Sequence, residues 1–176
     1  MTSLLASAMG EAFDALPNPL RAFHSPDGPT TWRGTVTIET GSTPQARALA
    51  RMSGFPSRPG TGPFDLTITP DGDRETWRRD YGGHVLTSRW SAGPDGTLEE
   101  RIGPLRIRLR PERRDNTLRL QVVALRVGAL PAPAALRGQG GGTESVDNQG
   151  RIAFDVESRA LGLGRLIRYF GHLTRV

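Results

Sequence analysis

The stretch Glu75–Arg101 constrains the fold of this chain more than any other, because it alternates apolar and polar residues over three short segments in a row. Turn residues at Gly82–Gly83 and Gly93–Gly96 separate these segments. Alternation with a period of two is the pattern of β-strands, whose successive side chains point to opposite faces. The sequence therefore predicts three consecutive strands here, joined by tight turns.

Two charged residues share the predicted inner faces of these strands. Arg79 lies between Trp77 and Tyr81 on the first strand, and Glu100 follows Leu98 at the same parity on the third. An unpaired charge inside a protein is very costly, so each residue needs a partner. We expect Arg79 and Glu100 to approach each other in the interior. Three interpretations stay open: a pair that fixes strand register, a pair that orients a ligand, or a parity error caused by a β-bulge.

The charge balance gives little support to nucleic-acid binding. The formal net charge is +5, and all 23 basic residues are arginine, a usage typical of codon bias in a GC-rich genome. The arginines are spread along the chain with 18 acidic residues among them, so we expect a solvated surface. The best candidate for polyanion binding is the row Arg106, Arg108 and Arg110, but it lacks the aromatic neighbours of a stacking platform. Nucleic acid is therefore an unfavoured partner.

Several site classes are excluded by composition and spacing. The chain has no cysteine, which rules out disulfides, thiol nucleophiles and cysteine-ligated metals. His24, His84 and His172 are far apart in sequence and show no metal-ligand spacing. The N-terminus lacks the layout of a signal peptide, and no window approaches the ~20 apolar residues of a membrane span. We expect a soluble, cytoplasmic protein without metal or cofactor.

The N-terminal segment 1–25 is predicted to be helical and to pack on the rest of the protein. Apolar residues recur at three- and four-residue spacing over 3–16, with Ser3 as N-cap and Pro17 as the stop. Pro19 then suits the start of a short helical turn. We expect this segment to cover the outside or one end of a sheet.

A second, shorter helix is predicted near residues 44–53. Thr43 is placed to cap it, and Gly54 follows its last turn. The run 56–63 is rich in proline and glycine and is predicted to be a loop.

Alternation continues through much of the remaining chain. The further predicted strands are Thr31–Thr40, Phe64–Thr69, Leu105–Arg110, Leu118–Val127, Thr143–Val146 and Ile152–Val156. Leu130–Leu136 is predicted to be a connector, and the glycine-rich Arg137–Thr143 a flexible stretch without the spacing of a phosphate-binding loop. Leu161–Thr174 fits either a helix or a strand, and its alternation favours a strand.

The sum is a mostly β protein with about ten antiparallel strands in a single domain, 1–176. Such a meander must protect its edge strands, and closure into a barrel does so most completely. We predict a closed or nearly closed barrel, with the N-terminal helix and the 44–53 helix packed at its ends.

Short motifs run along nearly the whole chain. They are Leu16-Pro17, His24, Gly54-Phe55-Pro56, Trp77-x-Arg79-x-Tyr81-Gly82-Gly83, Glu100-Arg101-x-Gly103-Pro104, Leu130-Pro131, Phe154-Asp155-Val156 and Tyr169-x-Gly171-x-Leu173. Together they resemble an uncharacterised bacterial family that is catalogued only as a domain of unknown function. Similar domains occur alone or attached to nicotinamide-dependent reductase or saccharopine-dehydrogenase-like proteins. The resemblance implies a reductase-type protein partner but no reaction, and Gly138–Gly142 departs from its pattern.

The functional hypothesis is non-catalytic binding of a small apolar or amphipathic molecule inside the barrel. Aromatic walls with a few polar anchors are the usual make-up of small-molecule sites. The candidate ligand-binding residues are Trp77, Arg79, Tyr81, Trp90, Glu100, Phe154, Tyr169 and His24. The alternatives are an accessory domain for a reductase-type partner, an enzyme using His24 or Glu100, and a polyanion-binding surface. No catalytic motif is present, so no catalytic residue is assigned.

Overall fold

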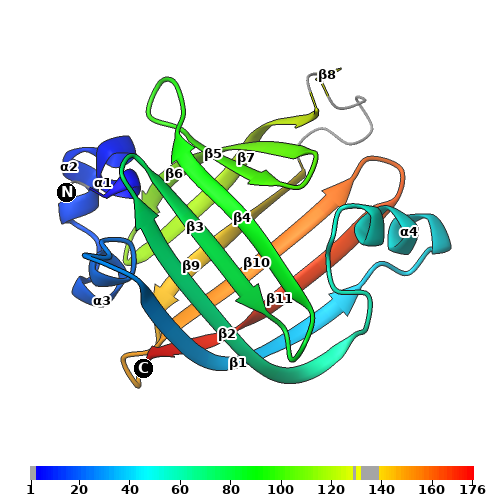
Figure 1. Cartoon of the computed structure of the whole chain (residues 1–176), viewed down its shortest axis with the longest axis horizontal. Helices are drawn as coiled ribbons and strands as arrows, with labels where there is room; N and C mark the ends of the chain where they lie inside the picture. The colour runs from blue at the N-terminus through cyan, green and yellow to red at the C-terminus, as the bar shows by residue number, and fades with distance from the viewer. Residues whose placement is uncertain (1–2, 129, 132–138) are drawn as a thin grey trace.

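The computed structural model describes residues 3–128, 130–131 and 139–176, and in these ranges it is built mainly of antiparallel strands (Figure 1). The strands are β1 (Thr30–Thr40), β2 (Gly60–Asp71), β3 (Arg74–Asp80), β4 (Val85–Ala92), β5 (Leu98–Ile102), β6 (Leu105–Arg114), β7 (Thr117–Val127), β8 (Leu130–Pro131), β9 (Gln139–Val146), β10 (Ile152–Ala160) and β11 (Gly164–Arg175). The helices are α1 (Leu4–Met9), α2 (Glu11–Asp14), α3 (Asn18–Phe23) and α4 (Pro44–Met52).

The predicted barrel is confirmed. The strands follow the order β6-β5-β4-β3-β2-β1-β11-β10-β9-β7, and an additional β6–β7 pairing closes this set of ten into a ring. The short strand β8 pairs with the end of β7 and adds nothing to the closure. Closure pairs both potential edges, so every strand of the ring has two neighbours.

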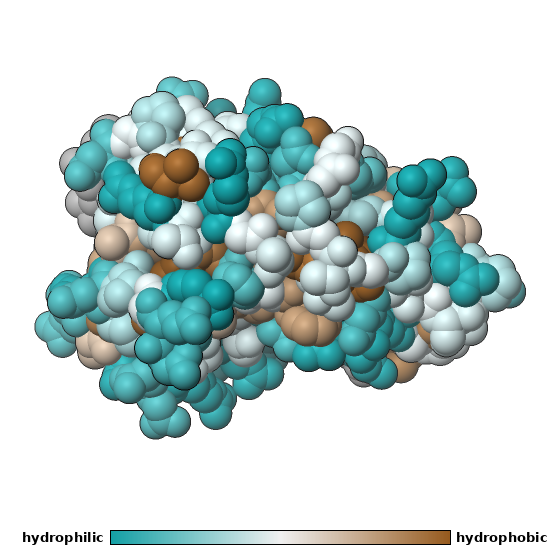
Figure 2. Space-filling view, turned by 90° about the horizontal axis from the view of Figure 1, so that it is seen from below, coloured by the Kyte–Doolittle hydropathy of each residue, from teal (hydrophilic) through white to brown (hydrophobic). Residues whose placement is uncertain are grey.

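The alternation in the sequence corresponds to inside and outside positions. In β3 and β4 every second residue is buried, which places Trp77 and Arg79 on the inner face of β3 and Leu86 and Trp90 on that of β4. The face shown in Figure 2 is mostly polar, with apolar side chains in small patches.

Helices lie at both ends of the barrel (Figure 1). At one end, α1 contacts β4, β5 and β6, while α3 contacts β9 and β10. Their buried side chains are Leu5, Phe13, Leu16, Leu20 and Phe23. At the other end α4 packs against β11, and we call this end of the barrel the α4 end. None of the helices in the described ranges combines the length and apolar character needed to cross a membrane.

The sequence predicts one continuous helix over 3–16, but the structure has two short helices there, α1 and α2. Gly10, with φ of 57°, separates α1 from α2. The predicted cap is confirmed, since the Ser3 hydroxyl accepts a hydrogen bond from the Ala6 backbone N–H at 3.0 Å. The predicted short turn is also confirmed, because α3 contains Pro19 near its start.

The predicted helix near 44–53 is confirmed as α4. The Thr43 hydroxyl accepts from the Ala46 backbone N–H at 3.1 Å, as expected of an N-cap. Strand β2 starts already at Gly60, inside the predicted 56–63 loop, because its first residues pair with the end of β1.

A second prediction, that the glycine-rich stretch Arg137–Thr143 is flexible, is wrong for the residues of it that the structure describes. Gln139–Thr143 is not a flexible segment but the first part of β9, which pairs with β10 over its whole length. Glycine lacks a side chain, so the alternation that marks a strand is missing from this part of the sequence. Arg137 and Gly138, like the connector residues 132–136, lie outside the described residues. The ambiguous segment Leu161–Thr174 is confirmed as mainly strand, since β11 runs from Gly164.

Strands β1 and β11 approach each other so closely that two positions require glycine. A Cβ added at Gly171 would lie 1.9 Å from the carbonyl oxygen of Thr35, and one at Gly34 would lie 1.8 Å from that of His172. Because the atoms met are backbone atoms, no side-chain rotation relieves the clash. The wall of the barrel at this pair of strands therefore depends on residues without a Cβ.

We predict that Gly171→Ala lowers the free energy of unfolding by about 2 kcal/mol or more, the range of overpacking substitutions. The matched control is Gly62→Ala in β2, where an added Cβ meets nothing within 4 Å and φ is not in the left-handed region. That control should change stability by less than about 0.5 kcal/mol. Urea unfolding measures both, and equal unfolding midpoints for the two variants would contradict the close approach.

Candidate functional site

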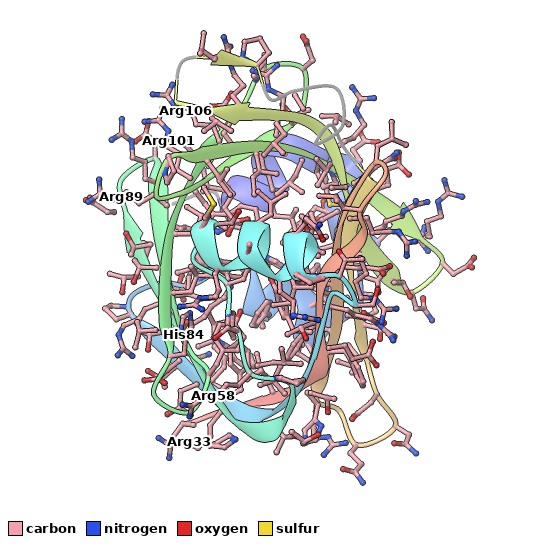
Figure 3. The ribbon with its side chains drawn as sticks, turned by 90° about the vertical axis from the view of Figure 1, so that its right-hand side faces the viewer. Arg33, Arg58, His84, Arg89, Arg101 and Arg106 are labelled. Atoms are coloured by element: carbon pink, nitrogen blue, oxygen red, sulfur yellow. The ribbon has the colours of Figure 1, made fainter. Side chains whose placement is uncertain are left out.

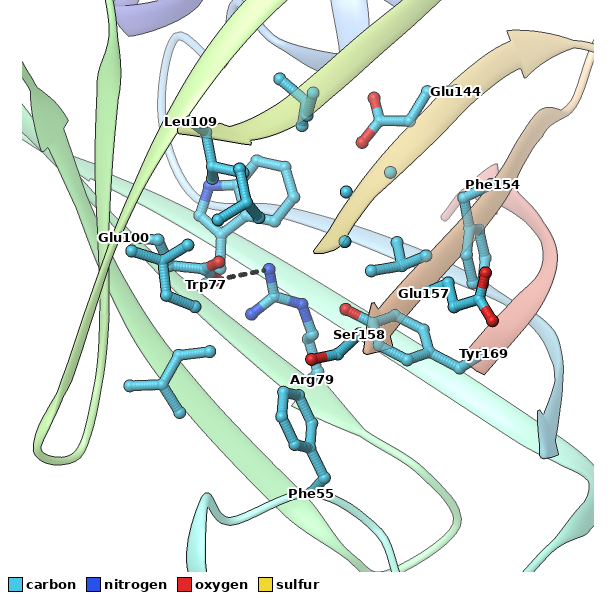
Figure 4. Close-up of a pocket in the computed structure, with 18 of the residues that line it drawn as sticks. Phe55, Trp77, Arg79, Glu100, Leu109, Glu144, Phe154, Glu157, Ser158 and Tyr169 are labelled. Atoms are coloured by element: carbon cyan, nitrogen blue, oxygen red, sulfur yellow. Dashed lines mark hydrogen bonds and ion pairs between the residues drawn. The ribbon is translucent and has the colours of Figure 1, made fainter. Parts of the chain in front are cut away.

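A cavity lies inside the barrel (Figure 4). The volume of this cavity is ≈ 140 Å³. A single buried water needs roughly 10–15 Å³, so the cavity is several times larger than a water site. The aromatic residues of the lining are Phe23, Phe55, Phe64, Trp77, Trp90, Phe154 and Tyr169. The cavity is thus large enough for a small organic molecule and is mainly apolar.

Arg79 and Glu100 form the principal polar feature of this cavity. Arg79 donates from Nη2 to Glu100 Oε1 at 3.0 Å and from Nη1 to Ser88 Oγ at 2.8 Å. The three residues lie on the neighbouring strands β3, β4 and β5. Arg79 is 7% exposed and Glu100 8%. The prediction that they approach each other inside the protein is therefore confirmed, and the alternative of a parity error is wrong.

The charge of Arg79 is retained despite its burial. Burial alone would lower the pKa of the guanidinium, but the nearby Glu100 carboxylate, followed by Tyr169 and Tyr81, raises that pKa above its ordinary value. The guanidinium also lies 5.2 Å from the centre of the Trp77 ring, within range of a cation–π contact. The pair therefore presents hydrogen-bonding groups to the cavity with a net charge of zero.

The tyrosines extend this polar region along the cavity wall. The rings of Tyr81 and Tyr169 are 5.8 Å apart and packed edge to face. Burial raises the pKa of Tyr169 to about 12, although the Arg79 cation opposes the shift. Burial likewise raises the pKa of Tyr81 well above its usual value. Both phenols therefore stay protonated and neutral at physiological pH.

The sequence predicts His24 as a ligand-binding residue, but His24 is not among the residues that line the cavity. It ends α3, and its Nε2 is 2.6 Å from Oε2 of Glu144 on β9. Both side chains are buried, and Glu144 is the member that faces the cavity. The pair joins the N-terminal helical segment to the barrel wall.

The structure brings most of the predicted site residues together. Those that line the cavity are Trp77, Arg79, Trp90, Glu100, Phe154 and Tyr169. Tyr81 is buried but is not among the lining residues, and its ring packs on Phe64 at 4.9 Å between ring centres. Their contact with a ligand stays a prediction.

Sequence reasoning missed Glu144, Phe55 and Ser158, which also line the cavity. Glu144 follows the glycines of β9, where no alternation indicates its face. It pairs directly with Phe154 of β10, so knowledge of this register would have assigned it to the interior. Within the described parts of the chain, no three His, Asp or Glu side chains are grouped closely enough to hold a metal ion.

The cavity reaches the barrel wall between β7 and β9. These strands pair only where Leu118–Gln121 meets Gly141–Glu144, and beyond this point β7 pairs with β6 and β8 instead. Val122 and Leu125 line the cavity from this diverging part of β7 and are only half-buried. The lining of the cavity is therefore partly exposed to solvent where β7 and β9 diverge.

We predict that Arg79→Met lowers the free energy of unfolding by about 3–5 kcal/mol, because it leaves the Glu100 carboxylate buried without its partner. Replacing both residues by methionine should recover most of this loss, since the double variant buries no charge. The control Arg33→Met breaks the Arg33–Asp65 pair, whose side chains are 63% and 39% exposed, and should cost less than about 1 kcal/mol. Chemical denaturation compares the three. A double variant less stable than Arg79→Met would contradict a coupled buried pair.

Comparison with known proteins adds a family but no activity. No curated protein matches the chain. The model of one family, described as Domain of unknown function (DUF4166), matches residues 16–173. This match runs from the link between α2 and α3 to β11 and includes every residue that lines the cavity. It confirms the resemblance to an uncharacterised family, and the chain therefore belongs to the family described as Domain of unknown function (DUF4166).

Proposed function

We propose that this protein binds a small amphipathic molecule inside the barrel without transforming it. One observation carries the proposal: an apolar, aromatic-lined cavity contains a buried ion pair whose charges cancel. Sites for small organic molecules usually combine these two elements, an apolar wall for the body of the ligand and a few polar groups for its orientation.

The apolar wall supplies the affinity. Phe154, Val156, Leu109 and Leu120 all line the cavity, so a hydrocarbon body would be surrounded by apolar side chains. Each methylene group removed from water contributes about 0.8 kcal/mol. A short chain or a single ring is the size that the cavity volume suits.

The ion pair selects the polar head of the ligand. Ser88 and Glu100 use two of the five N–H donors of Arg79, which leaves donors for an oxygen of the ligand. A charged head would add an unbalanced charge to a buried, neutral pair, and such a charge is expensive to bury. We therefore propose a ligand with an uncharged head, such as a hydroxyl, carbonyl or amide group.

An enzyme acting through Glu100 is the second candidate, and one observation favours it. Glu100 lines the cavity and has a hydrogen-bonded partner, which is a geometry that general acid–base catalysis also uses. The two functions differ in what happens to the molecule that enters. A binder releases it unchanged, whereas an enzyme releases a product of different structure. The third candidate, an accessory domain for a reductase-type partner, rests on the family resemblance alone.

The head-group preference can be tested with octanol, octanoate and octylamine, which share one hydrocarbon chain. Trp77 and Trp90 line the cavity, so their fluorescence reports an occupant. We predict that octanol binds at least about tenfold more tightly than either charged analogue, which corresponds to about 1.4 kcal/mol.

The double variant Arg79→Met/Glu100→Met is the informative comparison, because it should bind octanol more weakly, having lost the donors for the hydroxyl, while keeping an apolar cavity. Arg33→Met, on the outer surface, should behave as the unmodified protein. Equal binding of octanol and octanoate would refute the uncharged head, and no saturable binding of any of the three would refute the cavity as a binding site.

A further inference from the structure

Four arginines lie side by side on the outer surface of neighbouring strands. The strand register places Arg89 of β4 opposite Arg101 of β5, Arg101 opposite Arg106 of β6, and Arg106 opposite Arg126 of β7. All four are exposed, and Figure 3 shows the first three along one side of the α4 end. We call these four residues the arginine row. Like charges directly opposite each other destabilise a sheet, so the row needs an explanation beyond folding.

Carboxylates do not relieve the repulsion among Arg89, Arg101 and Arg106. Some other exposed arginines of the barrel do face acidic partners, as Arg33 does with Asp65 at 2.9 Å. Within the ranges that the structure describes, Arg89, Arg101 and Arg106 have no such partner. The row differs from the predicted row along β6, in which Arg108 is bound to Glu99 at 2.9 Å. Cross-strand register, not the order along one strand, therefore brings Arg89, Arg101 and Arg106 side by side on this surface.

Aliphatic residues lie beside the row. The pair after Arg106 and Arg126 is the half-buried Leu105 and the exposed Val127, and Val127 in turn pairs with Leu130 of β8. One residue along a strand is about 3.3 Å, so the apolar pair lies just beyond the charges, towards the α4 end. Leu130 is 72% exposed.

Two further aliphatic side chains project at this end. Met52, at the last position of α4, is 79% exposed, and Leu161, in the turn after β10, is 59% exposed. They come from elements that surround the same opening of the barrel as the ends of β7 and β8. The α4 end thus combines separate apolar tips with a band of positive charge.

We propose that the α4 end docks on a bilayer that contains anionic phospholipids. The apolar tips Leu130, Leu161 and Met52 enter the interface between headgroups and acyl chains, while the arginine row contacts the phosphates. Peripheral proteins bind anionic membranes through this combination of shallow apolar insertion and basic charge.

A bilayer fits these residues better than a nucleic acid does. The large exposed apolar side chains of the described chain are all aliphatic, with no aromatic ring to stack on a base. Aliphatic tips gain nothing from a sugar–phosphate backbone but do gain from a lipid interface.

Docking also brings a partly exposed part of the cavity lining towards the source of an amphipathic molecule. Val122 and Leu125 line the cavity from the part of β7 that diverges from β9. This route for the ligand rests on the proposed function, whereas the docking itself does not.

The test is flotation of the whole protein with two kinds of vesicle, phosphatidylcholine alone and equal parts of phosphatidylcholine and phosphatidylglycerol. We expect binding to the mixed vesicles and little to the neutral ones. Each basic residue near an anionic surface contributes about fivefold to partitioning, so Arg89→Gln/Arg101→Gln/Arg106→Gln should weaken binding by at least about tenfold.

The matched control is Arg110→Gln/Arg113→Gln/Arg119→Gln. It removes the same charge from exposed arginines of β6 and β7 that lie away from the α4 end and, among the described residues, have no acidic partner. Leu130→Ser/Leu161→Ser should weaken binding without changing charge. The docking proposal is overturned if the two arginine triples weaken binding equally, if neutral vesicles bind as well, or if a single-stranded oligonucleotide binds more tightly than the mixed vesicles.

Octanol binding by the same variants separates this proposal from the proposed function. The row variant should bind octanol as the unmodified protein does, because the row lies outside the cavity. Loss of vesicle binding with octanol binding intact locates the defect in docking alone. Vesicle binding without any octanol binding would leave the docking surface valid and refute the ligand site.

Discussion

The Arg79–Glu100 ion pair is the interaction on which the interior of this barrel depends. A guanidinium and a carboxylate are tolerated inside because three adjacent strands bring Arg79, Ser88 and Glu100 within hydrogen-bonding distance. A slip of one residue between β4 and β5 would turn the carboxylate outward and leave the guanidinium inside alone. The pair therefore couples strand register to the polarity of the cavity, and the same contact serves both stability and recognition.

Closure of the ring determines where the cavity lies. The N-terminal helices fill one end of the barrel with large apolar side chains. Strands β7 and β9 pair only where Leu118–Gln121 meets Gly141–Glu144, and they diverge towards the other end of the barrel. The glycines of β9 belong to the wall of the barrel but project no side chains into the cavity. An added Cβ at Gly141 would lie 2.4 Å from the carbonyl oxygen of Leu120. The cavity is the interior volume that helices and side chains leave unfilled on the side of the α4 end, where the aliphatic tips and the arginine row also lie.

Much of the fold and about half of the site chemistry could be predicted from the sequence, because both depend on local alternation. The inner positions of Arg79 and Glu100 follow from a period of two along single strands. Glu144 could not be found in this way, because glycines precede it and carry no pattern. The break at Gly10 was also missed, since the apolar spacing continues across it. The arginine row depends on pairing between strands, which alternation along one strand does not specify.

The central claim is that the cavity holds a small, uncharged amphipathic molecule next to the ion pair. Native mass spectrometry of the protein purified from its host tests it most directly, with a denaturing spectrum of the same sample as reference. We predict an added mass in the native spectrum that disappears on denaturation and is less abundant in the Arg79→Met/Glu100→Met variant. A native mass equal to that of the bare chain, in protein that also fails to take up octanol, would contradict it.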